Sequence, residues 1–341
     1  MKVLVTGGAG YIGSTVVSAL AEAGAVPVVL DSLVQGRAEF AAGHSLYMGD
    51  IADVGMLDRI FAEHPDISTL MHFAARIDVE ESTRLPSLYY RENLCKGAAL
   101  LEEVLRRGVR RVIFSSTAAV YRGGDGSRGL PEDAPTEPLS PYARSKLMFE
   151  GVLSDLCAQF GASAVALRYF NPVGADPALR SGPYKPDPSH ILGKLTGLAA
   201  VGGGEFVING DDYPTRDGTP VRDYVHVWDL ARAHLSALNY VNGAGPGCTV
   251  VNVGSGSGVT VREFVDAFMA VTGLPLTVRV GGRRPGDTAG AYADTGQAES
   301  RLGWRPERSL EEGIRDALAW EERFRAGGQG VARREERPAW G

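Results

Sequence analysis

The chain has 341 residues, 44% of them hydrophobic and 22% charged, and its 35 basic and 41 acidic side chains give a formal net charge of −6. These proportions are typical of globular proteins, and domains usually contain roughly 100–200 residues, so we expect one large domain or two closely packed ones. The composition excludes fibrous and disulfide-stapled miniature architectures. The acidic balance provides no surface for nucleic acid or anionic lipid, so we expect neither partner.

The sequence carries no recognisable targeting segment or metal motif. The first residues lead directly into a glycine turn, which leaves no place for a signal peptide, and no later run reaches 18 consecutive apolar residues. Cys95, Cys157 and Cys248 are scattered without CxxC spacing, so neither a disulfide framework nor a zinc site is expected. These features predict a cytoplasmic protein that binds no metal.

The first half of the chain alternates short β-branched runs with helical patterns. Strands are predicted at Lys2–Thr6, Val26–Leu30, Thr69–Phe73, Arg111–Ser115 and Ala164–Tyr169. Helices are predicted between them at Gly13–Ala23, Asp53–His64, Leu88–Arg107 and Pro141–Phe160. This alternation indicates βαβ units, so we expect a Rossmann-type α/β fold, a doubly wound parallel sheet that binds ligands at the carboxyl ends of its strands.

The pattern changes after Asn171, where five prolines within 17 residues interrupt regular structure. We place there the boundary between a first, ligand-binding domain, residues 1–172, and a smaller α/β substrate-binding domain, residues 173–325. The later elements predicted are buried strands near 224–227 and 250–254, which return to the first sheet, and helices at Val261–Thr272 and Leu310–Phe324. Residues 326–341 are predicted to form a flexible tail.

A glycine-rich turn follows the first predicted strand, and Gly7, Gly10 and Gly13 have GxxGxxG spacing. At a dinucleotide site such a turn bends sharply, approaches a pyrophosphate and directs helix amides at its charge, and side chains would block all three. An ordinary strand-to-helix turn is the alternative interpretation. Asp31 ends the second strand, where a carboxylate can accept hydrogen bonds from a ribose and repel a 2′-phosphate, which predicts NAD rather than NADP.

Further cofactor contacts are expected at the ends of the next strands. Asp50 and Ile51 are placed to reach an adenine, although a helix N-cap is an equally good interpretation of Asp50. The segment Phe73-Ala74-Ala75 ends a strand with residues small enough for a cofactor to lie across them. The sequence therefore predicts a dinucleotide site along one edge of the sheet.

Tyr142 and Lys146 are four residues apart in a predicted helix, so the phenol and the ammonium share one face. A phenol with a pKa near 10 is a poor base at neutral pH, but a neighbouring Lys⁺ and an oxidised nicotinamide both favour the phenolate. An amphipathic surface pair is the alternative explanation of the spacing. Thr117 ends the preceding strand and supplies a hydroxyl for a reacting sugar, so three functional groups are predicted to converge beside the cofactor.

With these motifs the chain resembles the extended short-chain dehydrogenase/reductase family, and within it the UDP-hexose 4-epimerases of the UDP-glucose type. The resemblance extends from Met1 to Phe324 and is carried by residues 5–13, 140–142, 167–175 and 209–227, the last of which reads NGDDYPTRDGTPVRDYVHV. It implies NAD as cofactor and a UDP-sugar as substrate. It also implies a homodimer, in which apolar helices around Leu94–Leu105 and Leu147–Leu156 pair as a four-helix bundle.

The resemblance implies roles for particular residues. It assigns catalysis to Tyr142 and Lys146, with Thr117 as the hydroxyl partner where many relatives carry serine. The implied cofactor contacts are Gly7, Gly10, Tyr11, Ile12, Asp31, Asp50, Ile51, Phe73, Ala74, Ala75, Asn93, Ser115, Tyr142, Lys146 and Tyr169. The implied substrate contacts are Thr117, Tyr142, Asn171, His190, Arg222, Arg284 and Asp287. Guanidinium groups suit a diphosphate, although a solvated surface arginine is the alternative for Arg284.

The reaction that the resemblance implies is inversion at C4 of the sugar through a transient 4-keto sugar. Ala118 and Ala119 occupy positions where related 4,6-dehydratases commonly carry Asp-Glu and UDP-glucuronate decarboxylases carry glutamate, which disfavours both activities. A non-catalytic NAD-binding sensor is the alternative from a different class, but it would not need Thr117, Tyr142 and Lys146 together.

Several positions depart from the family pattern and bear on the choice of sugar. Ile77 stands in place of the usual lysine, Ser189-His190 in place of an Asn-Asn pair, Ala291 in place of a frequent tyrosine, and Arg122 in place of a glycine. The alanine is expected to widen the pocket, and the residues able to meet a carboxylate are Arg76, Arg122, Lys185 and His190. UDP-glucuronate, UDP-galacturonate and UDP-N-acetylhexosamines are therefore alternatives to UDP-glucose and UDP-galactose, although a single basic residue is more often solvated surface.

Overall fold

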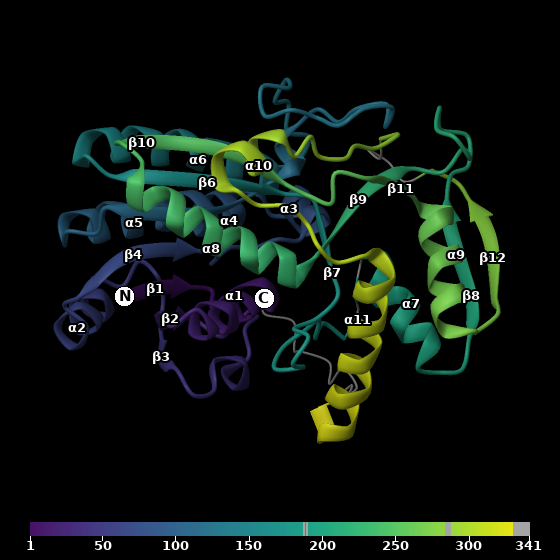
Figure 1. Ribbon diagram of the computed structural model, residues 1–341, viewed down its shortest axis with the longest axis horizontal. Helices are drawn as coiled ribbons and strands as arrows, with labels where there is room; N and C mark the ends of the chain where they lie inside the picture. Colours follow the sequence, from purple (N-terminus) through teal and green to yellow (C-terminus); the bar gives the residue numbers. More distant parts are fainter. Residues whose placement is uncertain (187, 189, 284–287, 330–341) are drawn as a thin grey trace.

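The computed structural model describes residues 1–186, 188, 190–283 and 288–329. Its main element is a parallel seven-stranded sheet with the strand order β10-β6-β5-β4-β1-β2-β3 (Figure 1). The strands are β1 (Lys2–Thr6), β2 (Val26–Asp31), β3 (Ser45–Met48), β4 (Ile67–His72), β5 (Arg111–Thr117), β6 (Ser163–Tyr169) and β10 (Gly247–Val253). The order reverses between β1 and β4, and ligands bind outside the carboxyl ends of such strands. The predicted fold class is confirmed.

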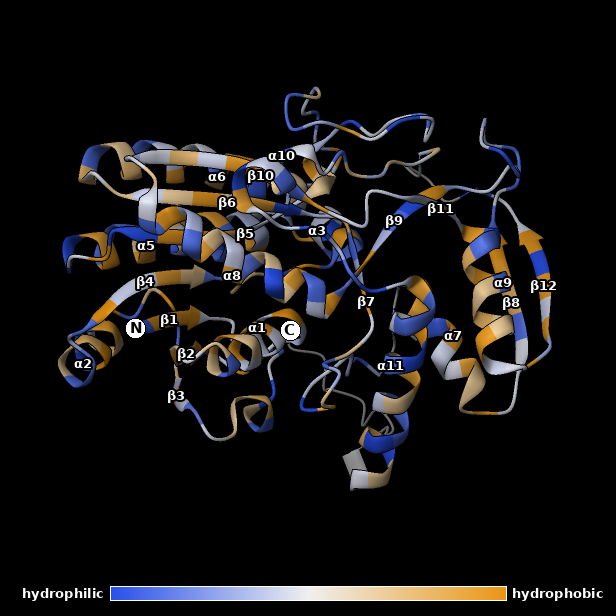
Figure 2. Cartoon of the chain, in the orientation of Figure 1, coloured by the Kyte–Doolittle hydropathy of each residue, from blue (hydrophilic) through white to orange (hydrophobic). Residues whose placement is uncertain are grey.

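Helices cover both faces of this sheet, and the strand residues alternate between two apolar cores. Val3 and Val5 belong to one core and Leu4 to the other. The first core includes side chains from α1 (Tyr11–Glu22), α8 (Val227–Gly243) and α10 (Gly296–Leu302), and the second from α2 (Val54–Glu63), α5 (Lys96–Arg106) and α6 (Pro141–Phe160). Because both faces are buried, the strands consist of nearly continuous apolar runs (Figure 2).

Helix α6, which carries Tyr142 and Lys146, has well-defined ends. The Ser140 hydroxyl accepts a hydrogen bond from the Ala143 amide at 3.2 Å, and Pro141 occupies the first turn. Gly161 ends the helix in the left-handed conformation, with φ of 64°. These signals explain why the predicted bounds of this helix match the observed ones.

The helix predicted over Leu88–Arg107 is present, and it contains a π-helical stretch that the sequence did not predict. The segment divides into α4 (Pro86–Tyr89), a π-helical stretch at Tyr90–Cys95 and α5. Within the π-helical stretch, the Asn93 side chain bonds both the amide and the carbonyl of Arg76, at 2.8 and 3.0 Å, and also Ser145 at 3.1 Å. The widened turn therefore joins the loop after β4 to α6.

The C-terminal part of the chain forms a smaller unit beside the carboxyl ends of the strands (Figure 1). Its sheets are β11-β9-β7 and β12-β8, built from β7 (Asn171–Val173), β8 (Gly204–Asn209), β9 (Val221–His226), β11 (Gly258–Thr260) and β12 (Leu276–Gly281). Its helices are α7 (Ile191–Ala199), α9 (Val261–Thr272) and α11 (Leu310–Phe324), around a core that includes Phe264 and Phe268.

Strand membership corrects one expectation. The predicted strand at 250–254 does return to the main sheet, as β10 paired with β6. The strand predicted at 224–227 does not, because β9 pairs with β7 and β11 instead.

Residues 330–341, most of the predicted tail, lie outside the described residues, and 325–329 form a short π-helical stretch that continues α11.

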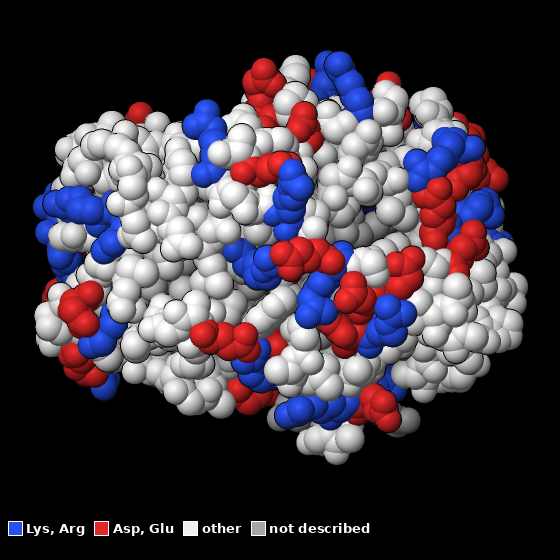
Figure 3. Space-filling model, viewed as in Figure 1, with Lys and Arg blue, Asp and Glu red and all other residues white. Residues whose placement is uncertain are grey.

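The described residues include no helix that is long and apolar enough to cross a membrane. On the face shown in Figure 3, basic and acidic side chains are interspersed rather than gathered into regions of one sign. Many of them form exposed ion pairs, such as Arg279 with Glu205 at 3.0 Å. Such pairs contribute little to stability, so the charges mainly keep the surface polar.

Candidate active site

A cleft of about 1760 Å³ lies between the carboxyl ends of the main-sheet strands and the smaller unit. Residues from the ends of β1, β2, β4, β5 and β6 line one side, and residues from α7 and α11 line the other. The cleft coincides with the reversal of strand order, which is where a doubly wound sheet binds its ligand. It is therefore the candidate active site.

The glycine turn after β1 forms the floor of the cleft. Gly7 has a φ of +73°, and a Cβ added there would lie 2.6 Å from the Ala74 amide nitrogen. A Cβ at Gly13 would lie 2.2 Å from the Gly7 carbonyl oxygen. The turn therefore lies so close to the end of β4 and to itself that residues larger than glycine do not fit at these two positions. The backbone amides at the start of α1 are left open toward the cleft.

Asp31 lies at the end of β2 and holds the turn in shape. Its carboxylate accepts hydrogen bonds from the amides of Ala9 at 3.0 Å and Leu33 at 2.9 Å. Burial raises the pKa of this carboxyl, while the two amide hydrogen bonds lower it. The Asp31 carboxylate lines the cleft. Its separation in sequence from the glycine turn is the one expected of a residue that binds a ribose hydroxyl.

The predicted catalytic groups meet at the opposite end of the cleft. The Lys146 ammonium donates a hydrogen bond to the Ser115 carbonyl at 2.7 Å and lies 4.8 Å from the centre of the Phe114 ring. The Thr117 hydroxyl lies close enough to the Tyr142 phenol to lower its pKa. Strand β5 and helix α6 thus bring the phenol, the ammonium and the hydroxyl to one place, and all three line the cleft.

Burial shifts the pKa values of this pair in opposite directions. It raises the pKa of the Tyr142 phenol, and the hydrogen bond to Thr117 lowers it. It lowers the pKa of the Lys146 ammonium to about 7, against the influence of the Glu150 carboxylate, which raises it. A lysine with a pKa near neutrality can exchange its proton at the pH where an enzyme works.

Most of the predicted cofactor residues line this cleft, namely Gly7, Gly10, Tyr11, Ile12, Asp31, Asp50, Ile51, Phe73, Ala74, Ala75, Ser115, Tyr142, Lys146 and Tyr169. Asn93 does not line the cleft, because its side chain is occupied in joining the loop at Arg76 to α6. Asp50 lines the cleft and forms an ion pair with Lys96, a residue that the sequence did not single out.

The predicted substrate residues are brought together less completely. Asn171 and His190 line the cleft, and His190 also caps α7 by accepting a hydrogen bond from the Gly193 amide at 3.1 Å. Arg222 is not among the lining residues and donates to the carbonyls of Val221 and Thr288. Arg284 and Asp287 lie outside the described residues.

The basic residues considered for a carboxylate separate into two groups. Arg76 and Lys185 line the cleft together with His190, and Arg76 also lies 3.5 Å from the Glu81 carboxylate. Arg122 does not line it and forms an exposed ion pair with Glu137 at 3.3 Å. A contact between Arg122 and a sugar is therefore not supported by this arrangement.

Helix α11 contributes residues to the cleft that the sequence did not suggest. Phe324 lines the cleft, and the Arg37 guanidinium lies 4.9 Å from the centre of its ring. One turn earlier, Trp320 packs against Phe40 with ring centres 5.6 Å apart and donates a hydrogen bond to the Pro183 carbonyl at 2.7 Å. No local motif marks these residues, because their role depends on contact with a loop almost 300 residues away in sequence.

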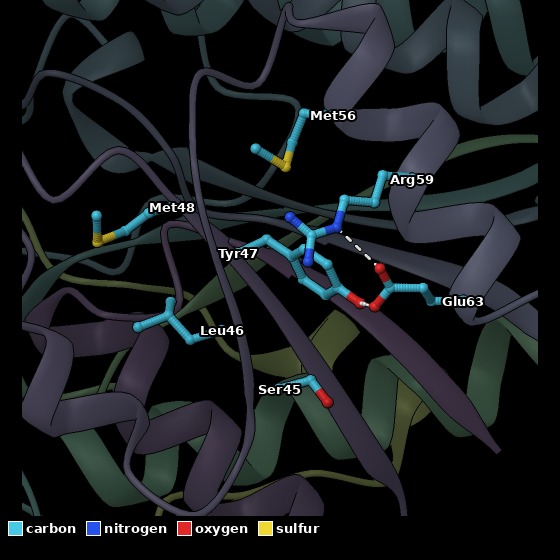
Figure 4. A pocket seen from close by; sticks show the side chains of 7 residues that line it. All are labelled: Ser45, Leu46, Tyr47, Met48, Met56, Arg59 and Glu63. Carbon is cyan, nitrogen blue, oxygen red and sulfur yellow. Dashed lines mark hydrogen bonds and ion pairs between the residues drawn. The ribbon is translucent and has the colours of Figure 1, made fainter.

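A second hollow lies at the outer edge of the main sheet and is lined by Ser45, Leu46, Tyr47, Met48, Met56, Arg59 and Glu63 (Figure 4). Glu63 accepts hydrogen bonds from Tyr47 at 2.5 Å and from Arg59 at 2.8 Å, so its polar groups satisfy one another. The hollow shares no lining residue with the cleft. In addition, the described residues contain no group of three or more His, Cys, Asp or Glu able to hold a metal ion.

Comparison with known proteins agrees with this geometry. The model of the NAD-dependent epimerase/dehydratase family matches residues 3–254. The chain belongs to this family, and the glycine cradle, Asp31 and the Tyr142–Lys146 pair described above fit the NAD that the family uses.

The similar proteins point to one activity within the family. A UDP-glucose 4-epimerase from Azospirillum brasilense is 45% identical over 323 residues, which cover 94% of this chain and 92% of that protein. A UDP-glucose 4-epimerase structure from Stenotrophomonas maltophila, with bound NAD and formylated UDP-arabinopyranose, is 36% identical, has a TM-score of 0.90 and covers 96% of this chain and 99% of that one. A Bifidobacterium longum UDP-glucose 4-epimerase in complex with NAD⁺ and UDP has a TM-score of 0.87 at 34% identity, covering 96% and 100%.

Proposed function

We propose that this chain catalyses the NAD-dependent 4-epimerisation of a UDP-hexose of the UDP-glucose/UDP-galactose class. The observation that carries the proposal is the convergence of Tyr142, Lys146 and Thr117 in the cleft whose other end is formed by the glycine turn and Asp31. The similarity to UDP-glucose 4-epimerases across nearly the whole chain supports it.

In the proposed mechanism, the chain's residues bind the UDP-sugar, move one proton and hold a transient 4-keto sugar. The glycine turn and Asp31 would hold NAD, which would supply reversible hydride transfer at C4. The Tyr142 phenolate takes the proton from the 4-hydroxyl and later gives it back, while the Lys146 charge favours the phenolate. Thr117 donates a hydrogen bond to the oxygen at C4. Binding through the distant UDP leaves the sugar free to turn over between the two transfers.

The identity of the sugar is tested directly. UDP-glucose, UDP-glucuronate and UDP-N-acetylglucosamine are incubated separately with the purified protein, and the 4-epimers are resolved by chromatography. We expect the fastest turnover with UDP-glucose. Preferred turnover of UDP-glucuronate would instead assign a carboxylate contact to Arg76, Lys185 or His190, which line the cleft. No epimer from any of the three sugars would refute the proposed function.

Thr117 is expected to have a smaller effect on catalysis than the tyrosine. Thr117→Val keeps the shape of the side chain and removes the hydroxyl that is proposed to donate a hydrogen bond to the oxygen at C4. The loss of one such hydrogen bond costs roughly 1–3 kcal/mol, so we expect kcat to fall by about 5- to 150-fold while KM changes little. Thr117→Ser retains a hydroxyl at this position and should keep most of the wild-type rate. A kcat as low in Thr117→Ser as in Thr117→Val would contradict a role for the hydroxyl.

We also propose that the protein is a cytoplasmic homodimer. The described cysteines are free, and Cys95 is exposed, which suits a reducing compartment. Most leucines of α5 are buried against the sheet, whereas Met148 on α6 is 48% exposed. Light scattering at micromolar concentration should give twice the 36.2 kDa of one chain; a value near the monomer mass would contradict the dimer.

A further inference from the structure

A buried ion pair lies behind the candidate catalytic residues. The side chains of Glu150 on α6 and Arg168 on β6 are 7% and 6% exposed, and they meet through two hydrogen bonds of 3.0 and 2.7 Å. This is the two-point geometry in which a guanidinium and a carboxylate bind most strongly. A buried ion pair is weak evidence for stability, because two charges must be removed from water, so its presence here calls for another explanation.

The pair is joined to the strand that carries the catalytic hydroxyl. The Ser116 hydroxyl donates a hydrogen bond to the same Glu150 carboxylate. The neighbours of Ser116 on β5 are Ser115, whose carbonyl accepts the Lys146 hydrogen bond, and Thr117, whose hydroxyl lies beside the Tyr142 phenol. Glu150 therefore holds β5 against α6 at the residue between the two catalytic contacts.

The position of Glu150 on α6 adds an electrostatic role. Tyr142, Lys146 and Glu150 follow one another at four-residue intervals, so they lie along one face of the helix. The Glu150 carboxylate raises the pKa of the Lys146 ammonium, whereas burial lowers it. A fixed negative charge one turn beyond the lysine thus favours its protonated form.

The other groups that face Lys146 do not supply this charge. His72 on β4 is fully buried, and burial together with the Lys146 charge lowers its pKa to about 3, so it is neutral at pH 7. Tyr169 on β6 interacts with Tyr142 rather than with the lysine, and burial raises its pKa well above the usual value, so this phenol is neutral too. From β5, Phe114 presents its ring and Ser115 its carbonyl.

The groups around the ion pair hold Arg168 in place. The Tyr121 ring lies 4.8 Å from its guanidinium carbon, and the Glu132 carbonyl accepts a hydrogen bond from it at 3.2 Å. Burial raises the pKa of the Glu132 carboxyl, which accepts a hydrogen bond from the Asn252 amide at 2.8 Å. Burial also raises the pKa of the nearby Cys248 thiol to about 12, so it stays neutral.

We propose that Glu150, with Arg168 as its counter-charge, is a positioning residue for the reaction. It fixes the end of β5 against α6 and places a carboxylate one turn behind Lys146. The proposal rests on the function proposed above. A purely structural ion pair would act only by holding β6 and α6 together, whereas the role proposed for Glu150 also depends on the negative sign of its charge.

The test is the pH dependence of Glu150→Gln. Glutamine keeps the shape and can still accept the Ser116 hydrogen bond, but the unbalanced Arg168 makes the surroundings of Lys146 and Tyr142 more positive. Positive charge lowers the pKa of both groups, so the pH profile of kcat should move to lower pH by about one unit. The double variant Glu150→Gln/Arg168→Met removes both charges, and its profile should return toward that of the wild type.

Two further variants separate charge from structure. Ser116→Ala removes the hydrogen bond without changing any charge, so we expect kcat to fall about tenfold with no shift of the profile. Glu205→Gln breaks the exposed pair with Arg279 and should leave the profile unchanged. The proposal would be overturned if the pH profile of Glu150→Gln were identical to that of the wild type. It would also be overturned if the double variant showed the same shift as Glu150→Gln. If Glu150→Gln fails to fold, the double variant and Ser116→Ala still provide the comparison.

A second measurement does not require turnover. Ultraviolet titration of the phenolate, taken as the difference between proteins with and without the Tyr142 hydroxyl, reports the ionisation of Tyr142 directly. Glu150→Gln should lower the pH of this ionisation. A wild-type protein that epimerises no sugar but shows this shift would refute the proposed function alone. Epimerisation without any shift would refute the role of Glu150 alone.

Discussion

Tyr142→Phe is expected to lose nearly all epimerase activity while keeping the fold and bound NAD. The substitution removes one oxygen at the point where α6, Thr117 and the cleft meet, and with it the group that is proposed to take the proton from the 4-hydroxyl. General base catalysis typically contributes roughly 10²–10⁴-fold, so kcat should fall by at least that factor. Steady-state assays with UDP-glucose measure the change.

A matched substitution controls for the loss of a phenol in general. Tyr240 lies on α8, where its hydroxyl bonds Thr249 at 3.2 Å on the main sheet, and Tyr240 does not line the cleft. Tyr240→Phe should therefore leave kcat unchanged. Near wild-type turnover by Tyr142→Phe with NAD still bound would require the whole catalytic assignment to be abandoned.

Gly7→Ala is expected to abolish the copurification of NAD. Gly7 combines a φ of +73° with a close approach, because an added Cβ would lie 2.6 Å from the Ala74 amide nitrogen. The end of β4 would have to move, and with it the turn that faces the cofactor. Denaturing the purified protein and assaying the released NAD measures the result; we expect a stoichiometric amount from the wild type and almost none from the variant.

Gly24→Ala provides the control for this substitution. Gly24 has a nearly equal φ of +78°, but an added Cβ would meet no atom within 4 Å. Both alanines carry the strain of a left-handed residue, roughly 1–2 kcal/mol, so the difference between the variants isolates the crowding at Ala74. Equal NAD content in the two variants would show that the close approach does not determine cofactor binding.

The sequence predicted the main sheet well because the signals for its elements are local. The bounds of β1, α6, α9 and α11 agree with prediction, since a glycine, a proline or a capping residue marks at least one end of each. The helix over Leu88–Arg107 was predicted, but its π-helical stretch was not, because the hydrogen bonds that Asn93 forms there come from distant segments. The sheet membership of β9 depends in the same way on pairing with β7 and β11.

The candidate site was predicted to the extent that motifs mark it. The glycine turn, Asp31 and the Tyr142–Lys146 spacing gave residues that line the cleft. Phe324 was not predicted, because an aromatic residue at the end of an amphipathic helix is ordinary in sequence and acquires meaning by packing against Arg37. The roles proposed for the individual site residues remain predictions until the variants are measured.

The position of α11 has a consequence for how the protein is made. The loop that contains Arg37 and Phe40 leaves the ribosome early, whereas Trp320 and Phe324, which pack against it, are translated after nearly all of the described chain. A nascent chain that ends before Leu310 can pair all seven strands of the main sheet, but it lacks the helix that borders this part of the cleft. The parallel sheet can therefore assemble during translation before the binding cleft is complete, because the cleft also requires α11.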